Sequence, residues 1–288
     1  MPMLERIAGN RELKQDLKTA LGSGRIAHSI LLVGEPGCGA GFAARCLAAD
    51  YLYPNGGPHA EAVLRGQDTE SIVVRGEGAS GQIKVEAIRD ARQNIQKSAL
   101  SSDAKGRVLF IYGAQNLNGA SANAMLKIME EPPEGVMFLL TASSAAAVLP
   151  PIRSRCVSRG AAYTMAPVPT EECAAALRTA QPELNEQNAQ DLAFLYEGHI
   201  GLCLKALTDP AAKVRGLGSV GFVELRTYND AGKLTTPRAE RLKDRRGLFV
   251  RQLLEAGITT ADGLETFTSP DFEYLGQDPY PGRYAFLC

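Results

Sequence analysis

The sequence predicts an α/β protein: a parallel sheet flanked by helices, then a small helical domain and a C-terminal segment whose structure the pattern leaves open. Four short apolar runs alternate with stretches of helical periodicity between residues 29 and 141, as in chains that form parallel sheets. A glycine-rich loop joins the first apolar run to a helix. Beyond residue 157, only helical patterns follow until about residue 210.

The predicted strands are near-continuous apolar runs, which are typical of strands buried on both faces. They cover residues 29–33, 71–74, 107–112 and 136–141. Helices are predicted where apolar residues recur every three or four positions, at residues 13–21, 42–51, 60–65, 85–95 and 121–131. Pro132 and Pro133 stop the last of these. Together these elements define a first domain, residues 1–165.

The remainder of the chain differs in its sequence pattern. Helices are predicted at residues 170–178, 188–196 and 200–207, which gives a small helical domain over residues 166–210. Residues 211–288 form the third region, which contains nine Gly and four Pro. One helix is predicted there, at residues 238–256, introduced by Thr236 and Pro237.

Composition excludes several functional classes. The 31 Lys and Arg residues balance 32 Asp and Glu residues, so no global positive charge indicates nucleic-acid binding, and any DNA contact must be local. No apolar run approaches the roughly 20 residues needed to cross a bilayer, and the N-terminus lacks a signal-peptide pattern. We therefore expect a cytoplasmic protein without a membrane partner. The six cysteines form no C-x-x-C pair, which favours small buried thiols over zinc ligands or disulfides.

The glycine-rich loop matches the frame of a phosphate-binding P-loop, G-x-x-x-x-G-K-[ST], but not its last two positions. Its glycines are Gly34, Gly37 and Gly39, and Ala40 and Gly41 stand where Lys and Ser or Thr are required. These replacements remove the cation that balances the β- and γ-phosphates and a hydroxyl ligand for Mg²⁺. The strand at residues 107–112 also ends in Tyr112 without a carboxylate, so a second Mg²⁺ ligand is missing.

The loop taken alone leaves two interpretations open. It could be a tight strand-to-helix turn without a ligand, or its backbone N–H groups at the helix N-terminus could still bind an anion weakly. Because two independent losses fall where phosphoryl transfer needs its groups, the sequence favours an inactive site. No cofactor is expected, and no cluster of residues predicts a metal site.

Two motifs carry a resemblance to a known family. Residues 122–133 read A-N-A-M-L-K-I-M-E-E-P-P, and residues 149–156 read L-P-P-I-R-S-R-C. The first is similar to the N-A-L-L-K-x-L-E-E-P-P segment of the AAA+ subunits of bacterial DNA polymerase III clamp loaders, and the second to their Ser-Arg-Cys motif. Both occur in the family order and spacing, and the similarity covers about residues 1–208. The resemblance implies an AAA+ sheet domain, a helical lid domain over residues 166–210 and a C-terminal collar.

In that family, the arginine of the Ser-Arg-Cys motif contacts the γ-phosphate of ATP held by a neighbouring subunit. The resemblance therefore implies that Arg155, between Ser154 and Cys156, is an arginine finger acting in trans. A guanidinium suits this role because its fixed charge and forked donors match the charge that spreads over the phosphoryl oxygens. The alternative from the residues alone is a surface arginine that caps a strand end.

A defective P-loop combined with an intact finger is similar to the delta-prime members of this family. The resemblance implies a non-hydrolysing stator in a hetero-oligomeric ring with gamma/tau-type motor subunits and a delta subunit. The ring would load the sliding clamp onto primed DNA within the DNA polymerase III holoenzyme. The alternatives are an autonomous AAA+ ATPase and a nucleotide-sensing regulator. DNA contact through Lys84, Arg89, Arg92 and Lys97 is a further hypothesis, against a solvated helix face.

The sequence departs from the family pattern in two places. Residues 51–68 contain no cysteine, so the four-cysteine zinc module that many relatives carry is absent. Residues 211–288 do not have the pattern of the family's helical collar, and they are a divergent collar, a replaced segment or a sequence altered by a frame change.

Overall fold

The computed structural model describes residues 2–24, 26–78, 81–97, 99–158 and 161–208, together with two strands at residues 273–277 and 284–287. The chain divides into two compact units, Met1–Val168 and Pro169–Cys288. The predicted helix at residues 238–256, and most of the predicted third region, lie outside the described residues.

The first unit is built on a five-stranded parallel sheet with the strand order β2-β3-β4-β1-β5. The strands are β1 (Ser29–Val33), β2 (Ser71–Arg75), β3 (Arg107–Tyr112), β4 (Val136–Ala142) and β5 (Ala161–Thr164). Apart from Tyr112, every residue of β1, β3 and β4 is buried, which explains why their sequences are near-continuous apolar runs. All four predicted strands are present, and β5 was not predicted.

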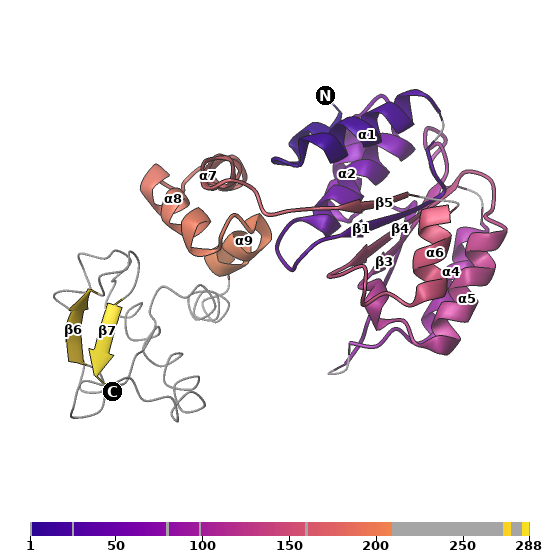
Figure 1. The fold of residues 1–288 in the computed structure, drawn as a ribbon. Coiled ribbons are helices and arrows are strands. Elements are labelled where there is room, and N and C mark those ends of the chain that lie inside the picture. Colours follow the sequence, from indigo (N-terminus) through magenta and orange to yellow (C-terminus); the bar gives the residue numbers. More distant parts are fainter. Residues whose placement is uncertain are drawn as a thin grey trace. The chain divides into compact units, whose positions relative to one another are not determined.

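Six α-helices cover the two faces of this sheet (Figure 1). They are α1 (Arg11–Gly22), α2 (Ala40–Leu52), α3 (Pro58–Arg65), α4 (Val85–Ile95), α5 (Gly119–Glu130) and α6 (Pro150–Ser158), with short 3-10 helices η1 (Met3–Arg6) and η2 (Ala114–Asn116). Alternate strand residues point to opposite faces. Ile30 and Leu32 of β1 pack with α1, α2 and α3, whereas Leu31 and Val33 pack with α4, α5 and α6. The predicted fold class, an AAA+-like parallel sheet flanked by helices, is confirmed.

The position of α5 is determined at both ends. At its N-terminus, Ser121 N–H donates to Asn118 Oδ1 and Asn118 N–H donates to Ser121 Oγ, each at 2.9 Å, so the two residues form a capping box. At its C-terminus the helix ends at Glu130, one residue earlier than predicted, before Pro132 and Pro133. The buried side chains of Met125, Ile128 and Met129 attach α5 to the sheet.

A buried ion pair joins the ends of β2 and β3 that lie opposite the glycine-rich loop. Glu70 is fully buried and accepts from Arg107 Nε at 3.2 Å. The same carboxylate accepts the backbone N–H groups of Leu100 and Ser101, each at 2.8 Å. Because both charged side chains are hydrogen-bonded and paired with each other, this network can hold the loop before β3 without leaving an uncompensated buried charge.

The second unit begins with three helices, α7 (Thr170–Ala180), α8 (Glu186–Leu195) and α9 (Ile200–Thr208), which agree with the predicted helical region. Cys173 of α7 and Cys203 of α9 are both buried, with their Sγ atoms 3.9 Å apart. Further along the chain, β6 (Glu273–Gln277) and β7 (Tyr284–Leu287) pair antiparallel. Within the described part of the chain, no helix is both long and apolar enough to cross a membrane.

Candidate functional site

The glycine-rich loop lies at the carboxyl edge of the sheet, where parallel α/β proteins place their ligands. It connects β1 to α2, as predicted. Gly37 and Gly39 have φ values of 98° and 93°, a region that only glycine adopts without strain, and Gly39 is the N-cap of α2. Gly34 lies close to two other residues: a Cβ there would be 3.2 Å from the Cβ of buried Met165 and 3.3 Å from that of Cys38.

The first turn of α2 begins with Ala40 and Gly41, and the ring of Tyr112 lies against it. A Cβ on Gly41 would be 3.3 Å from Tyr112 Cε1 and 3.8 Å from Cδ1. The ring is stacked on Phe110, with centroids 5.6 Å apart, and the guanidinium carbon of Arg75 is 5.5 Å from the Tyr112 ring centroid. The aromatic ring therefore lies where a hydroxyl side chain at position 41 would project.

Two arginines and one aspartate contribute to the electrostatic surroundings of Tyr112. Burial raises the pKa of the Tyr112 phenol above its ordinary value; the guanidinium groups of Arg45 on α2 and Arg75 on β2 lower it in part, and the carboxylate of Asp68 raises it further. The Nε atom of Arg45 is buried without a hydrogen-bond partner in the described residues. Two arginines and a phenol thus lie near the end of β3 and the first turn of α2. In a working P-loop protein, these positions supply a carboxylate and a hydroxyl that bind Mg²⁺.

Ser154, Arg155 and Cys156 lie on α6, which begins at Pro150. Ile152 and Cys156, four residues apart, are fully buried in the core, and burial raises the pKa of the Cys156 thiol to about 12. Ser154 is exposed, and the Arg155 side chain is 21% exposed. Arg155 therefore lies within a helix and not at a strand end, the alternative that the residues alone left open. Only two of the nine residues of α6 face the core, so the sequence shows no helical pattern there.

Arg155 Nη2 donates to the carboxylate of Glu130, the last residue of α5. The motif residues 154–156 and the E-E-P-P segment that begins at Glu130 therefore meet in space, although 25 positions separate the two charged residues. Both motifs are recognisable in the sequence, but the contact between them is not.

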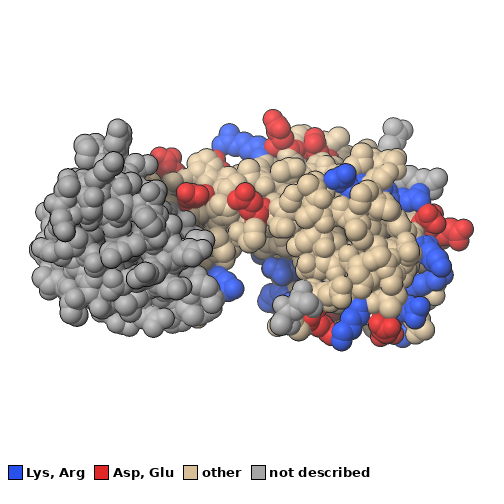
Figure 2. All heavy atoms as spheres, turned by 60° about the horizontal axis from the view of Figure 1, so that its bottom comes forward, with Lys and Arg blue, Asp and Glu red and all other residues tan. Residues whose placement is uncertain are grey.

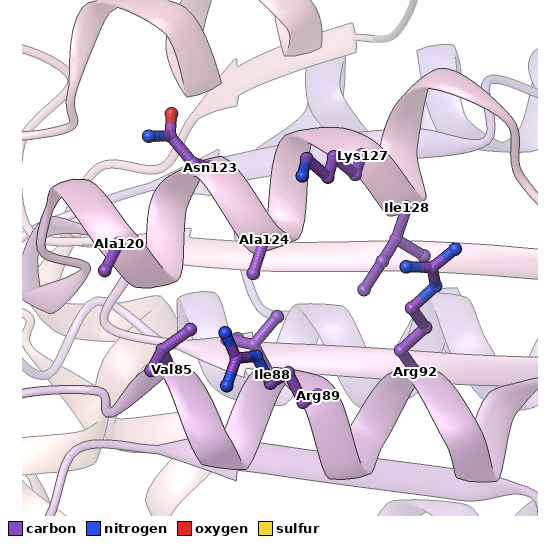
Figure 3. Close-up of a pocket in the computed structure, with 9 residues that line it drawn as sticks. All are labelled: Val85, Ile88, Arg89, Arg92, Ala120, Asn123, Ala124, Lys127 and Ile128. Atoms are coloured by element: carbon purple, nitrogen blue, oxygen red, sulfur yellow. The ribbon is translucent and has the colours of Figure 1, made fainter.

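A groove with a volume of about 230 Å³ runs between α4 and α5 (Figure 3). Arg89 and Arg92 line it from α4, and Lys127 lines it from α5, with Asn123 beside it. None of these three cations has an ion-pair partner in the described residues. Of the four basic residues in the DNA-contact hypothesis, which was weighed against a solvated helix face, only Arg89 and Arg92 line this groove. Lys84 pairs with Glu77 at 3.7 Å, and Lys97 donates to Asn94 at 2.8 Å.

The rest of the described surface adds few candidates. Lys and Arg side chains are interspersed with acidic ones over the face drawn in Figure 2, as the balanced composition predicts. The five cysteines in the described residues are all buried, in agreement with the prediction of small core thiols. In the same part of the chain, no group of three or more His, Cys, Asp or Glu residues could hold a metal ion.

The parallel sheet, the loop after β1 and the helices on both faces define an AAA+-like fold. The solved structure of a RuvB P216G mutant from Thermotoga maritima superposes on 88% of this chain and 73% of its own length with a TM-score of 0.54. At 17% sequence identity, this likeness shows the fold alone.

Sequence comparison places the chain within this class. The model of the family described as DNA polymerase III, delta subunit, matches residues 9–159, just over half of the chain, and the chain belongs to that family. DNA polymerase III subunit gamma/tau of Mycobacterium bovis is 31% identical over 155 residues, which cover 52% of this chain and 27% of that protein. DNA polymerase III subunit delta' of Haemophilus influenzae is 40% identical over 74 residues, or 26% of this chain and 22% of that protein.

The matched segments thus span about a quarter of the length of these two relatives. The predicted relationship to bacterial clamp-loader AAA+ subunits is confirmed.

Proposed function

We propose that this chain is the non-hydrolysing stator of a bacterial clamp loader, and that it supplies Arg155 to ATP bound by a neighbouring subunit. The proposal rests chiefly on the Tyr112 ring, which lies against Gly41 and is flanked by Arg45 and Arg75. A loop without its lysine and hydroxyl, next to a strand without its carboxylate, lacks the groups that hold Mg²⁺ and balance phosphate charge. The chain's own loop is therefore proposed to be catalytically inactive.

The position of Arg155 supports a role outside its own subunit. Its backbone is anchored by the buried neighbours Ile152 and Cys156, while its guanidinium remains partly exposed. An arginine that reaches a neighbour's γ-phosphate stabilises charge that develops in the transition state, a contribution on the order of 10³ to 10⁵ in rate. The chain would thus contribute to catalysis without owning an active site.

The proposed partners are gamma/tau-type motor subunits and a delta subunit in a ring that loads the sliding clamp onto primed DNA, as part of the DNA polymerase III holoenzyme in the cytoplasm. In this proposal, residues 166–210 are the lid and residues 211–288 hold the ring as a collar-like or divergent segment. The groove between α4 and α5 supports a local DNA contact, because Arg89, Arg92 and Lys127 present three cations without an ion-pair partner among the described residues.

Two experiments test this function. The purified chain, assayed alone, should show no Mg²⁺-dependent ATP hydrolysis, and it should co-purify with the ATP-hydrolysing gamma/tau subunit of its organism. Hydrolysis by the isolated chain that survives purification and is abolished by Gly39→Asp would favour an autonomous ATPase. Failure to co-purify would favour a separate nucleotide-sensing regulator.

Arg155→Ala should then lower the ATP turnover of the reconstituted loader with clamp and primed DNA, at unchanged assembly. Arg155→Lys should restore little, because an ammonium lacks the planar fork. Arg153→Ala is the matched control. Arg153 lies on the same helix and its Nη1 donates to the backbone carbonyl of Ala145 at 3.2 Å. Equal turnover in the Arg155→Ala and unmodified loaders would refute the finger assignment.

A further inference from the structure

The ion pair between Arg155 and Glu130 joins α6 to α5 at a partly exposed position. Nη2 of Arg155 is its donor, and the side chains of Arg155 and Glu130 are 21% and 49% exposed. The Nε and Nη1 atoms of Arg155 donate no hydrogen bond within the described residues. Glu130 therefore holds one nitrogen of the guanidinium and leaves the donors on the other two available.

Both backbones that carry this pair are anchored in the core. Glu130 closes a helix whose N-terminus is capped by Asn118 and whose Ile128 and Met129 are buried. Arg155 follows Ile152 and precedes Cys156, both fully buried. The conformational freedom of the pair therefore lies mainly in the two side chains. An arginine side chain loses much rotamer entropy when it is held in one geometry.

A single-contact ion pair at this exposure contributes little to stability, because solvent screens it and ordering two long side chains offsets it. Its effect on the orientation of the guanidinium is larger. Glu130 limits the conformations that the Arg155 side chain can sample. Part of the entropy cost of orienting the guanidinium toward a phosphate is therefore already met before the neighbour's ATP binds.

We infer that Glu130 is a positioning residue for Arg155: its carboxylate holds Nη2 so that the remaining guanidinium donors face a phosphate on the neighbouring subunit. The inference rests on the proposed function, because it assigns Glu130 a role only through Arg155. It also gives the E-E-P-P segment a role in the neighbour's reaction, in addition to ending α5.

The charge and the hydrogen-bond acceptor of Glu130 can be separated. Glu130→Gln retains an oxygen that accepts from Nη2 but removes the negative charge, whereas Glu130→Ala removes both. A positioning role needs the acceptor, so Gln should restore most of the turnover that Ala loses. Glu131→Ala is the matched control, since it removes an exposed carboxylate one residue further along that forms no hydrogen bond or ion pair with Arg155 among the described residues.

The test uses the full-length chain reconstituted with its gamma/tau and delta partners, clamp and primed DNA, at matched assembly. ATP turnover and KM are measured for Glu130→Ala, Glu130→Gln, Glu131→Ala, Arg155→Ala and the Glu130→Ala/Arg155→Ala double variant. Glu130→Ala should lower kcat by up to about 100-fold, the loss that a misplacement of about 1 Å can cause. The double variant should match Arg155→Ala alone, because Glu130 has nothing left to position.

The outcomes separate the inference from the function on which it rests. If Arg155→Ala leaves turnover unchanged, the finger itself is refuted, and the positioning role with it. If Arg155→Ala lowers turnover but Glu130→Ala does not, or raises it, only the positioning role is overturned. Additive losses in the double variant would also overturn it, because Glu130 would then act independently of Arg155.

Discussion

Gly41→Thr tests the contact between Tyr112 and the first turn of α2. The substitution restores the hydroxyl that a P-loop carries at this position, and its Cβ would lie 3.3 Å from Tyr112 Cε1. Threonine adds two further heavy atoms beyond that Cβ. The ring has little room to retreat, since it is stacked on Phe110 at 5.6 Å between centroids, with Arg75 on its face.

The expected destabilisation follows from two opposing effects. Overpacking a well-filled site costs about 1–3 kcal/mol in the free energy of unfolding. Replacing glycine within a helix returns a few tenths of a kcal/mol, because threonine has the better helix propensity. We therefore expect a net loss of about 1–2 kcal/mol for Gly41→Thr, whereas Gly41→Ala should be close to neutral.

The assay is urea denaturation of four proteins: the unmodified chain, Gly41→Thr, Tyr112→Ala and the double variant. Tyr112→Ala removes the ring, so the double variant should be more stable than the sum of the single effects by about 1–2 kcal/mol. Gly119→Thr is the control, because no atom lies within 4 Å of a Cβ added in this first turn of α5. Additivity of the two single effects within about 0.5 kcal/mol would show that residue 41 and the ring do not compete for space.

Three further outcomes are expected. Glu70→Ala should lower the free energy of unfolding by about 3–5 kcal/mol, because it leaves Arg107, 8% exposed, uncompensated; a urea-denaturation loss below about 1 kcal/mol would contradict this. In the assembled loader, replacing Arg89, Arg92 or Lys127 by Ala should each make the negative slope of log affinity for primed DNA against log salt shallower by about 0.9, with Lys84→Ala as control; unchanged slopes would exclude the groove. Burial raises the pKa of Cys156 from 9.0 to about 12, so above pH 9 the folded state keeps a proton that the unfolded chain releases. Stability should therefore fall between about pH 9 and 12, and Cys156→Ala should reduce this slope by up to about 1.4 kcal/mol per pH unit; an unchanged slope would show that the thiol titrates normally.

The strands were predictable where burial on both faces produces an unbroken apolar run. The bounds of β1 and β3 agree with those predicted because glycine follows each run directly. In contrast, β5 is a four-residue edge strand with no fully buried residue, so its Ala-Ala-Tyr-Thr sequence carries no such run.

The residues that belong to a single motif of the candidate site could be predicted from the sequence, but the contacts between different motifs could not. The spacing of Gly34, Gly37 and Gly39 indicated the loop, and the two missing residues at its end could be read directly. The contact of Tyr112 with Gly41 depends on how α2 packs on β3. The pairing of Arg155 with Glu130 likewise depends on how α6 packs on α5, and no periodicity in the sequence encodes either arrangement.

The capping box at Asn118 has a consequence for how this family can vary in length. It fixes where α5 starts, and with a rise of 1.5 Å per residue the twelve-residue helix carries Glu130 about 18 Å along its axis. One residue inserted or deleted within α5 would shift that carboxylate by about 1.5 Å and rotate it by about 100° around the helix. The length of α5 therefore sets the distance between its N-cap and the carboxylate that pairs with Arg155. Insertions should be tolerated in the loops around it, whereas even a whole turn added within it would move Glu130 by about 5.4 Å along the axis and away from Arg155.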